Sequence, residues 1–159
     1  MLTGKRASES ATEMVQVVLP NDANPLGYIL GGTVMHLIDI AGAIAAHRHT
    51  RQLLVTAAVD DLQFLHPIKV GDLIILESHV TCTFTTSLEV QVDVYSEGTL
   101  TGERRLTSRA FLTFVTTEVN GVRPRVPPLL VETSDERREQ EEAQARRAAR
   151  LARRAAASS

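Results

Sequence analysis

The sequence predicts an α+β fold in which an antiparallel five-stranded sheet wraps around one central helix. Three observations lead to this prediction. A long apolar helix is expected at about residues 33–49, one strand-like segment precedes it, and four strand-like segments follow it. Because those four segments are joined by short turns, neighbouring strands are expected to be antiparallel. One apolar helix packed on one such sheet is a common two-layer arrangement.

The composition limits the classes of function that the chain can have. Its 159 residues fit one domain with a short appendage. A net charge of -2 and only 4% aromatic residues argue against a specific nucleic-acid partner. A single cysteine excludes an internal disulfide, and we find neither a secretory signal nor a convincing membrane span. We therefore expect a cytoplasmic protein without a membrane span.

Changes in composition divide the chain into three parts. Residues 1–11 are polar and are expected to be disordered, whereas residues 12–128 contain all the sheet and helix signals. Residues 129–159 are expected to form a charged C-terminal helical extension. We therefore expect one folded domain followed by one helix.

The central helix is the most informative element. Its apolar residues cover nearly every face, and a helix that is apolar all round is expected to be buried. Thr33 is a plausible N-cap, preceded by Gly31 and Gly32. Asp39 is the one carboxylate in the middle of this helix, and a buried carboxylate costs free energy unless it is paired or functional. Asp39 is therefore the first candidate for a catalytic residue.

The strands are predicted from β-favouring residues and turn signals. We expect them at residues 12–19, 53–65, 73–84, 87–96 and 104–118. In the fourth of these, valines and a leucine alternate with polar residues, as is typical of a half-buried strand. Asn120-Gly121 is a strong turn signal that ends the last strand.

The extension has its acidic residues first and its arginines last, between Ser134 and Arg154. This order complements the helix dipole, and Ser134 is a plausible cap. Because its apolar stripe consists only of alanines and Leu151, we favour a solvent-exposed helix. A docking helix for an oligomer or for acidic partners is the alternative.

The start of the central helix suggests a chemistry. A substrate carbonyl placed there would meet the backbone N–H groups of Gly32 and Thr33, which would stabilise a developing oxyanion. Asp39, further along the same helix, could activate a water as a general base or attack directly as a nucleophile. The amide of Asn24 could orient the water or hold the substrate's carbonyl oxygen, although Asn24 is also an ordinary residue for a turn before Pro25.

Other candidate groups are less convincing. The five histidines are expected to have structural roles, and Cys82 is expected to be a small apolar filler in a strand. No serine or cysteine lies in a nucleophile-elbow pattern, and no metal-ligand spacing is found. We therefore expect no metal and no cofactor.

Four segments of the chain, in order, resemble one family. They are LPNDANPLGYILGG, MHLIDIAGAIAAHRH, VDDLQFLHPIKVGD and TTSLEVQVDVYSEGTLTGERRLTSRAFLTFV. Together they resemble the hotdog-fold acyl-CoA thioesterases, and within them the cytosolic acyl-CoA hydrolase branch. The resemblance covers about residues 12–128, and the charged tail also resembles an extension of some members.

The resemblance implies an acyl-CoA thioesterase that hydrolyses fatty acyl-CoA to free fatty acid and CoA, so that CoA is part of the substrate rather than a cofactor. It also implies a homodimer whose sheets join edge to edge, with active sites between subunits, and assembly into a trimer of dimers. By motif match, Asp39 is the catalytic carboxylate, Asn24 comes from the opposite subunit, and the Gly32 amide meets the thioester carbonyl.

The residues that bind CoA are less clearly indicated. Tyr28 and His66 depart from residues that are frequent in the family, and either could alter how CoA or the acyl chain is held. The candidates for CoA binding are Gly31, Thr86, Ser87, Thr107, Ser108 and Arg109, because a basic side chain suits CoA phosphates.

Two other functions compete with the thioesterase prediction. A hotdog enoyl-CoA hydratase would need a histidine a few residues from its aspartate, but the next histidine after Asp39 is His47 at the far end of the helix. A non-enzymatic acyl-CoA sensor would need an output module, and only the C-terminal helix could serve as one. The acyl-chain length is left open.

Overall fold

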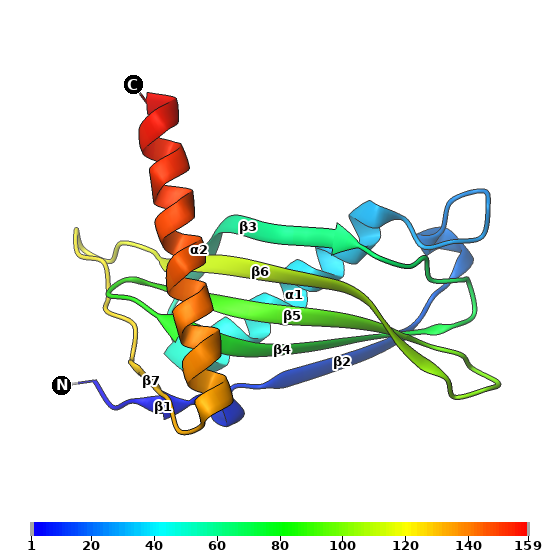
Figure 1. The fold of residues 1–159 in the computed structure, drawn as a ribbon, viewed down its shortest axis with the longest axis horizontal. Coiled ribbons are helices and arrows are strands. Elements are labelled where there is room, and N and C mark those ends of the chain that lie inside the picture. Colours follow the sequence, from blue (N-terminus) through cyan, green and yellow to red (C-terminus); the bar gives the residue numbers. More distant parts are fainter. Residues whose placement is uncertain (1, 159) are drawn as a thin grey trace.

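The computed structural model describes residues 2–158 and contains the central helix and the five-stranded sheet (Figure 1). The α+β prediction is therefore confirmed. The elements, in chain order, are β1 Lys5–Arg6, η1 Ala7–Glu9, β2 Thr12–Val17, η2 Pro20–Asp22, α1 Gly31–Thr50, β3 Leu54–Phe64, β4 Leu73–Thr83, β5 Ser87–Glu97, β6 Arg104–Thr116, β7 Leu129–Leu130 and α2 Ser134–Ser158.

The main sheet has the strand order β2-β4-β5-β6-β3, and all its neighbouring strands are antiparallel. The predicted turn at Asn120-Gly121 is also present, because Val119 and Val122 pair across it and both turn residues have positive φ. This order leaves β2 and β3 as the two edges of the sheet. Within residues 2–158, strand β3 is thus paired on one side only, with β6.

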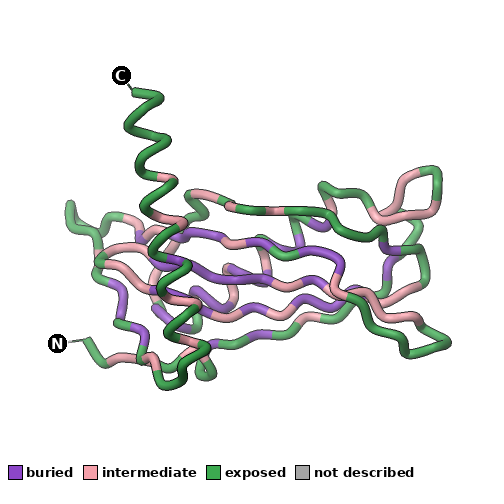
Figure 2. Tube along the Cα trace, viewed as in Figure 1, coloured by how far each residue is buried: buried purple, intermediate pink, exposed green. Residues whose placement is uncertain are grey.

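The core lies between α1 and one face of the sheet (Figures 1 and 2). The inward side chains of β5, which the sequence pattern placed on one face, have no exposed surface: Leu88, Val90, Val92 and Val94. Alanines and Gly42 on the facing side of α1 allow a close approach, and a Cβ on Gly42 would lie only 3.3 Å from the ring of Phe114. The Ser78 hydroxyl fastens β4 to α1 by donating to the Ala41 carbonyl oxygen at 2.8 Å.

The ends of α1 differ from the prediction. The helix begins at Gly31 with Leu30 in the N-cap position and no side-chain cap, so the prediction that Thr33 is the N-cap was wrong. At the other end Arg51 adopts a left-handed conformation, φ 52°, and its N–H donates to the His47 carbonyl oxygen at 2.7 Å. Within residues 2–158, neither helix is long and apolar enough to cross a membrane.

The central helix is also less buried than its composition predicts. One face packs on the sheet, but Met35, His36 and Asp39 are exposed in the single chain. Met35 is 47% exposed, and Val59 on the neighbouring edge strand β3 is 43% exposed. The expectation of a helix buried on all sides was therefore wrong for one chain, and an apolar surface remains open beside β3.

The N-terminal segment differs from the expectation of disorder. Lys5 and Arg6 pair in parallel with Leu129 and Leu130, and a short helical turn follows at η1. A Cβ on Gly4 would lie 2.6 Å from a methyl group of Leu130, so the chain passes very close to β7 here. The segment is thus held against the start of the C-terminal extension.

The C-terminal helix α2 crosses the sheet on the face opposite α1 and then continues past the edge at β3 (Figure 1). It is capped by Thr133, whose hydroxyl oxygen accepts the Glu136 N–H at 3.1 Å, so Ser134 is not the cap. Arg146 binds Glu89 with two hydrogen bonds of 3.0 and 2.8 Å, and Arg150 binds Asp60 at 2.8 Å. The first part of α2 is therefore docked, whereas residues 151–158 are exposed as expected for a solvated helix (Figure 2).

Candidate active site

The first turn of α1 offers free backbone donors. The first hydrogen bond within the helix runs from the Val34 N–H to the Leu30 carbonyl oxygen at 3.1 Å. The N–H groups of Gly31, Gly32 and Thr33 have no acceptor among the described residues. A helix N-terminus carries partial positive charge, so these donors can bind an anion or a developing oxyanion.

Asp39 lies seven residues after Gly32, about two helical turns, and therefore on the same face of α1. Its Oδ1 accepts a hydrogen bond of 2.7 Å from the Thr56 hydroxyl of β3. The pairing of β3 with β6 shifts register just after Thr56, and such irregularities re-aim side chains. The carboxylate thus has a fixed orientation while its second oxygen has no partner among residues 2–158.

A cavity of about 320 Å³ lies beside this carboxylate. It reaches from the start of α1 to the inward side of β3, and a Cβ added to Gly32 would meet open space rather than protein. Its lining residues are Gly32, Met35, His36, Ile38, Asp39, Thr56, Val59, Leu62 and Leu112. The walls are mostly apolar, with the carboxylate and the Thr56 hydroxyl as polar groups.

Asn24 lies in the loop before α1 and shapes that loop. Its side-chain oxygen accepts the N–H groups of Leu26 at 3.0 Å and Tyr28 at 3.1 Å. Its NH₂ group has no hydrogen-bond partner in the described part of the chain. The side-chain oxygen of Asn24 therefore stabilises the turn, and the two N–H donors of its NH₂ group remain available to a ligand.

A second cavity, of about 430 Å³, is lined by Asn24, Gly31, Phe64, His66 and Ser108 among others. Asp39 does not line it, although Gly31 and Gly32 are adjacent in the chain. Within one chain the structure therefore places Asn24 and Asp39 at different cavities, on two sides of the helix N-terminus.

Of the six residues predicted to bind CoA, only Gly31 and Ser108 line a cavity with Asn24. Thr107 is fully buried, and its hydroxyl donates to the Val94 carbonyl oxygen at 3.0 Å. Thr86 and Ser87 lie at the other end of β5, where Ser87 pairs with Val115. Within one chain, none of these three residues lines a cavity with Asn24.

Arg109, the remaining candidate, is occupied by an ion pair. Its guanidinium binds both carboxylate oxygens of Asp93 at 2.6 and 3.1 Å. This hydrogen bonding raises the pKa of Arg109. Within one chain, neither Arg109 nor Asp93 lines the cavities that Asn24 and Asp39 line, so a role of Arg109 in CoA binding stays a prediction.

Two other side chains of chemically reactive types, His49 and Cys82, are buried in the protein interior. His49 is fully buried and its Nε2 donates to the Pro127 carbonyl oxygen at 2.7 Å, while burial lowers the pKa of its imidazole. Burial also raises the pKa of the Cys82 thiol to about 11, which makes it a poor nucleophile at neutral pH. Across residues 2–158 no three His, Cys, Asp or Glu side chains are grouped so that they could hold a metal ion.

Thr56 is the residue of this site that the sequence analysis missed. It is one of many β-favouring residues in a strand that carries two register shifts, so its side-chain direction cannot be read from alternation. Only the contact with Asp39 distinguishes it.

The sequence of the chain matches known proteins. The model of the thioesterase superfamily matches residues 26–103. The chain is 42% identical to an uncharacterized acyl-CoA thioester hydrolase, YkhA, of Bacillus subtilis, over 80% of this chain and 74% of that protein. It is 36% identical to the cytosolic acyl coenzyme A thioester hydrolase of Mus musculus, over 82% of this chain but only 37% of that longer protein.

Solved structures are similar over almost the whole chain. A hexameric acyl-CoA thioesterase superposes with a TM-score of 0.90 and 40% identity, over 97% of this chain and 99% of that one. The acyl-CoA hydrolase of Staphylococcus aureus, solved with butyryl coenzyme A and coenzyme A, superposes with a TM-score of 0.88 and 33% identity, over 97% and 94% of the two chains. Variants of that hydrolase with an aspartate, an asparagine or a threonine replaced by alanine are also structurally similar.

Proposed function

The chain belongs to the thioesterase superfamily, and from this premise we propose that it hydrolyses fatty acyl-CoA to free fatty acid and CoA. Similar proteins named acyl-CoA thioester hydrolases support an enzyme with thioesterase activity. The observation that carries the proposal is the carboxylate of Asp39, oriented by Thr56 beside free helix N–H donors. The staphylococcal variants change the same three residue types that this site uses, namely aspartate, asparagine and threonine.

Each residue of the proposed site has its own role in the hydrolysis. The Gly32 N–H binds the thioester oxygen and stabilises the negative charge that develops on it. Asp39 accepts a proton from a water whose oxygen bonds to the acyl carbon; the C–S bond then breaks and the sulfur leaves as the thiol of CoA after protonation. In the alternative mechanism, the Asp39 carboxylate attacks the acyl carbon directly and releases CoA, and water then hydrolyses the acyl-enzyme. Asn24 uses its free NH₂ group to position the reactants.

We place each active site between two subunits. Asn24 and Asp39 line separate cavities within one chain, so a site that uses both needs a second copy. Among the described residues, edge strand β3 has no neighbour on one side. Val59 on this strand is 43% exposed and lines one cavity with Met35 of α1, which is 47% exposed. An exposed apolar edge of this kind is a template for pairing with another chain. The similar hexameric thioesterase supports assembly of such dimers into a trimer of dimers, and the murine relative supports a cytosolic location.

The proposal is tested by steady-state hydrolysis of an acyl-CoA chain-length series, with CoA release followed by a thiol reagent. Asp39→Asn is nearly isosteric and is expected to lower kcat at least about a hundredfold, because loss of a general base typically costs this much. CoA binding, measured by calorimetry, is expected to persist. The chain-length series identifies the preferred acyl group.

Asp135→Asn is the matched control. The side chain of Asp135 is 80% exposed in the first turn of α2, and it lines neither of the two cavities, so this variant is expected to be as active as the wild type. Wild-type protein that binds CoA without hydrolysing any chain would contradict the enzyme proposal and favour an acyl-CoA sensor. Turnover unaffected by Asp39→Asn would leave a thioesterase but remove Asp39 from its mechanism.

A further inference from the structure

His36 is a polar side chain that lines the cavity beside Asp39 and that the proposed mechanism does not use. The only other polar side chains that line this cavity, among the described residues, are those of Asp39 and Thr56. An ionised carboxylate only accepts hydrogen bonds, and the Thr56 hydroxyl already donates to Asp39 at 2.7 Å. The imidazole of His36 is therefore the side chain of this cavity that can donate a hydrogen bond to a substrate.

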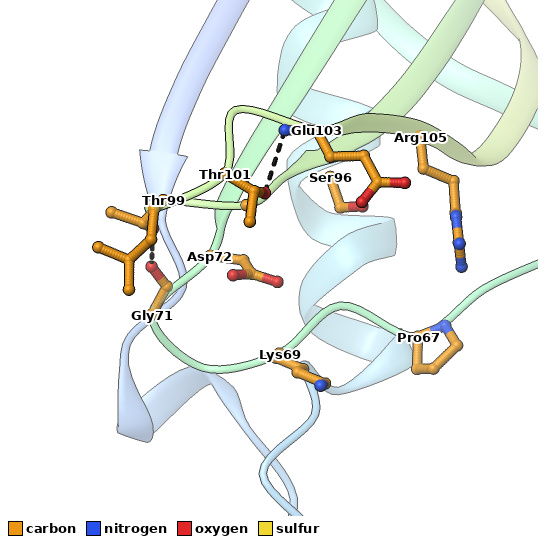
Figure 3. Close-up of a pocket in the computed structure, with 11 residues that line it drawn as sticks. Pro67, Lys69, Gly71, Asp72, Ser96, Thr99, Thr101, Glu103 and Arg105 are labelled. Atoms are coloured by element: carbon orange, nitrogen blue, oxygen red, sulfur yellow. Dashed lines mark hydrogen bonds between the residues drawn. The ribbon is translucent and has the colours of Figure 1, made fainter.

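The cavity between the β3–β4 segment and the β5–β6 hairpin has a different kind of lining (Figure 3). Charged side chains of both signs line it, namely Lys69, Asp72, Glu103 and Arg105. Several donors and acceptors are thus available there, and none is distinguished from the others. In the Asp39 cavity a single free side-chain donor lies among mostly apolar walls, where a hydrogen bond to a developing charge is strong.

The ring nitrogens of His36 have no hydrogen-bond partner among residues 2–158. Three of the other histidines are hydrogen-bonded within the chain, as structural roles require: His47, His49 and His79. His66 also lacks a partner in the described chain, but it lines the cavity that contains Asn24. The structural role expected for every histidine therefore has no contact to support it at His36.

The geometry of α1 places His36 between the two groups that the proposed reaction uses. With a rise of about 1.5 Å per residue, His36 follows Gly32 by about 6 Å along the helix axis and precedes Asp39 by about 4.5 Å. Residues three or four positions apart share a helix face, and side chains lean toward the helix N-terminus. The imidazole therefore leans toward the turn that contains Gly32, whose N–H has no acceptor within the described chain and which lines the same cavity.

We infer that the imidazole of His36 is a second donor of the oxyanion site and binds the thioester oxygen together with the Gly32 N–H; the inference rests on the proposed function. Oxyanion sites combine backbone N–H groups with side-chain donors, histidine among them. An imidazole keeps at least one N–H whether it is neutral or protonated, so the donor is present in both states. The proton stays on the ring nitrogen, because His36 stabilises the charge on oxygen and takes no part in protonating the sulfur.

The position of His36 at the surface of one chain agrees with this role. His36, Met35 and Asp39 are exposed on the face of α1 beside β3, where the proposed second subunit packs. A subunit that covers this face would exclude water from the donor, and this strengthens its hydrogen bond to a developing anion. The donor would thus reach full strength only in the dimer.

The test measures kcat and ligand affinity in two variants of His36. His36→Leu replaces the donor with an apolar side chain, so kcat on acyl-CoA is expected to fall about a hundredfold with KM nearly unchanged. His36→Gln keeps an N–H donor and is expected to retain at least about a tenth of the wild-type kcat. The affinity of His36→Leu for S-trifluoroacetonyl-CoA, whose ketone forms a tetrahedral adduct, is expected to fall at least about tenfold, whereas its affinity for CoA is expected to be unchanged. Calorimetry measures both affinities.

His47→Leu is the matched control, because His47 lies in the last turn of α1 and lines neither the Asn24 cavity nor the Asp39 cavity. It is expected to be as active as the wild type. Full activity of His36→Leu, or equal losses in the Leu and Gln variants, would overturn the inference while the thioesterase proposal stands. A loss of CoA affinity equal to the loss of kcat would also overturn it, since His36 would then bind the ground state. If the wild type hydrolyses no acyl-CoA, the ketone decides: equal binding by wild type and His36→Leu, or none by either, overturns the inference.

Discussion

At the scale of single residues, Gly32 is a position where a substitution is expected to change activity without lowering the stability of the fold. Its N–H is free at the start of α1, and a Cβ there would enter the cavity beside Asp39 rather than meet protein. The fold of one chain therefore does not require glycine at this position. The proposed oxyanion site does, because a methyl group would occupy the space of the thioester.

Gly32→Ala is expected to leave the melting temperature unchanged or slightly raised, because alanine favours a helix by about 1 kcal/mol over glycine. Its kcat/KM for acyl-CoA is expected to fall at least about tenfold. Calorimetric melting and steady-state kinetics on the same preparation measure both effects. A variant as active as the wild type would show that the substrate does not lie against Gly32.

Other single residues explain how far sequence alone could define the site. Asp39 and the two glycines stand out because their types are unusual on an apolar helix. Thr56 does not stand out, because the irregular register of β3 hides the direction of its side chain.

At the scale of elements, α2 is the clearest departure from a sequence pattern. Its stripe of alanines predicts an exposed helix, yet its arginines bind the sheet through their flat guanidinium groups. Arg146 lies 3.6 Å from the ring centre of Phe111 and Arg147 lies 4.4 Å from that of Phe84. Arginine is counted as polar in a hydropathy pattern although it can stack and bury its stem, so this docking was not predicted.

The Arg146–Glu89 pair is the centre of this docking. Only 3% of the Glu89 side chain is exposed, and the Thr81 hydroxyl donates to it at 2.7 Å as well. Arg146→Met removes the cation but leaves the carboxylate buried, so we expect the free energy of unfolding to fall by about 3 kcal/mol. Urea denaturation measures this change.

Arg138→Met is the control for that experiment, because Arg138 is 63% exposed and its ion pairs are on the helix surface. It is expected to change the free energy of unfolding by less than about 0.5 kcal/mol. Equal effects of the two substitutions would contradict a docked α2.

The strands and α1 were easier to predict than α2. Their apolar periods and turn residues are local signals, and the predicted strand bounds lie within a few residues of those in the structure. The start of α1 was misplaced because Gly31 and Gly32 look like loop residues, whereas the structure includes them in the helix.

At the scale of the whole molecule, the single chain is incomplete in two respects. The open edge of β3 and the exposed face of α1 leave apolar surface beside Asp39. Asn24 and Asp39 line different cavities, although the proposed reaction uses both. A dimer formed along β3 would resolve both features, by covering the apolar surface and by completing each site with a residue from the partner.

Activity of mixed assemblies is the most direct measurement of this shared-site account. Asp39→Asn and Asn24→Asp are each expected to be inactive; aspartate keeps the oxygen that binds the Leu26 and Tyr28 N–H groups but loses the NH₂ donors. Unfolded together and refolded, the two variants form mixed dimers in which one of the two sites is intact. We predict recovery of about a quarter of the wild-type activity on acyl-CoA. Mixed dimers that form, as detected by capture through a tag on one variant, but remain inactive would contradict the account.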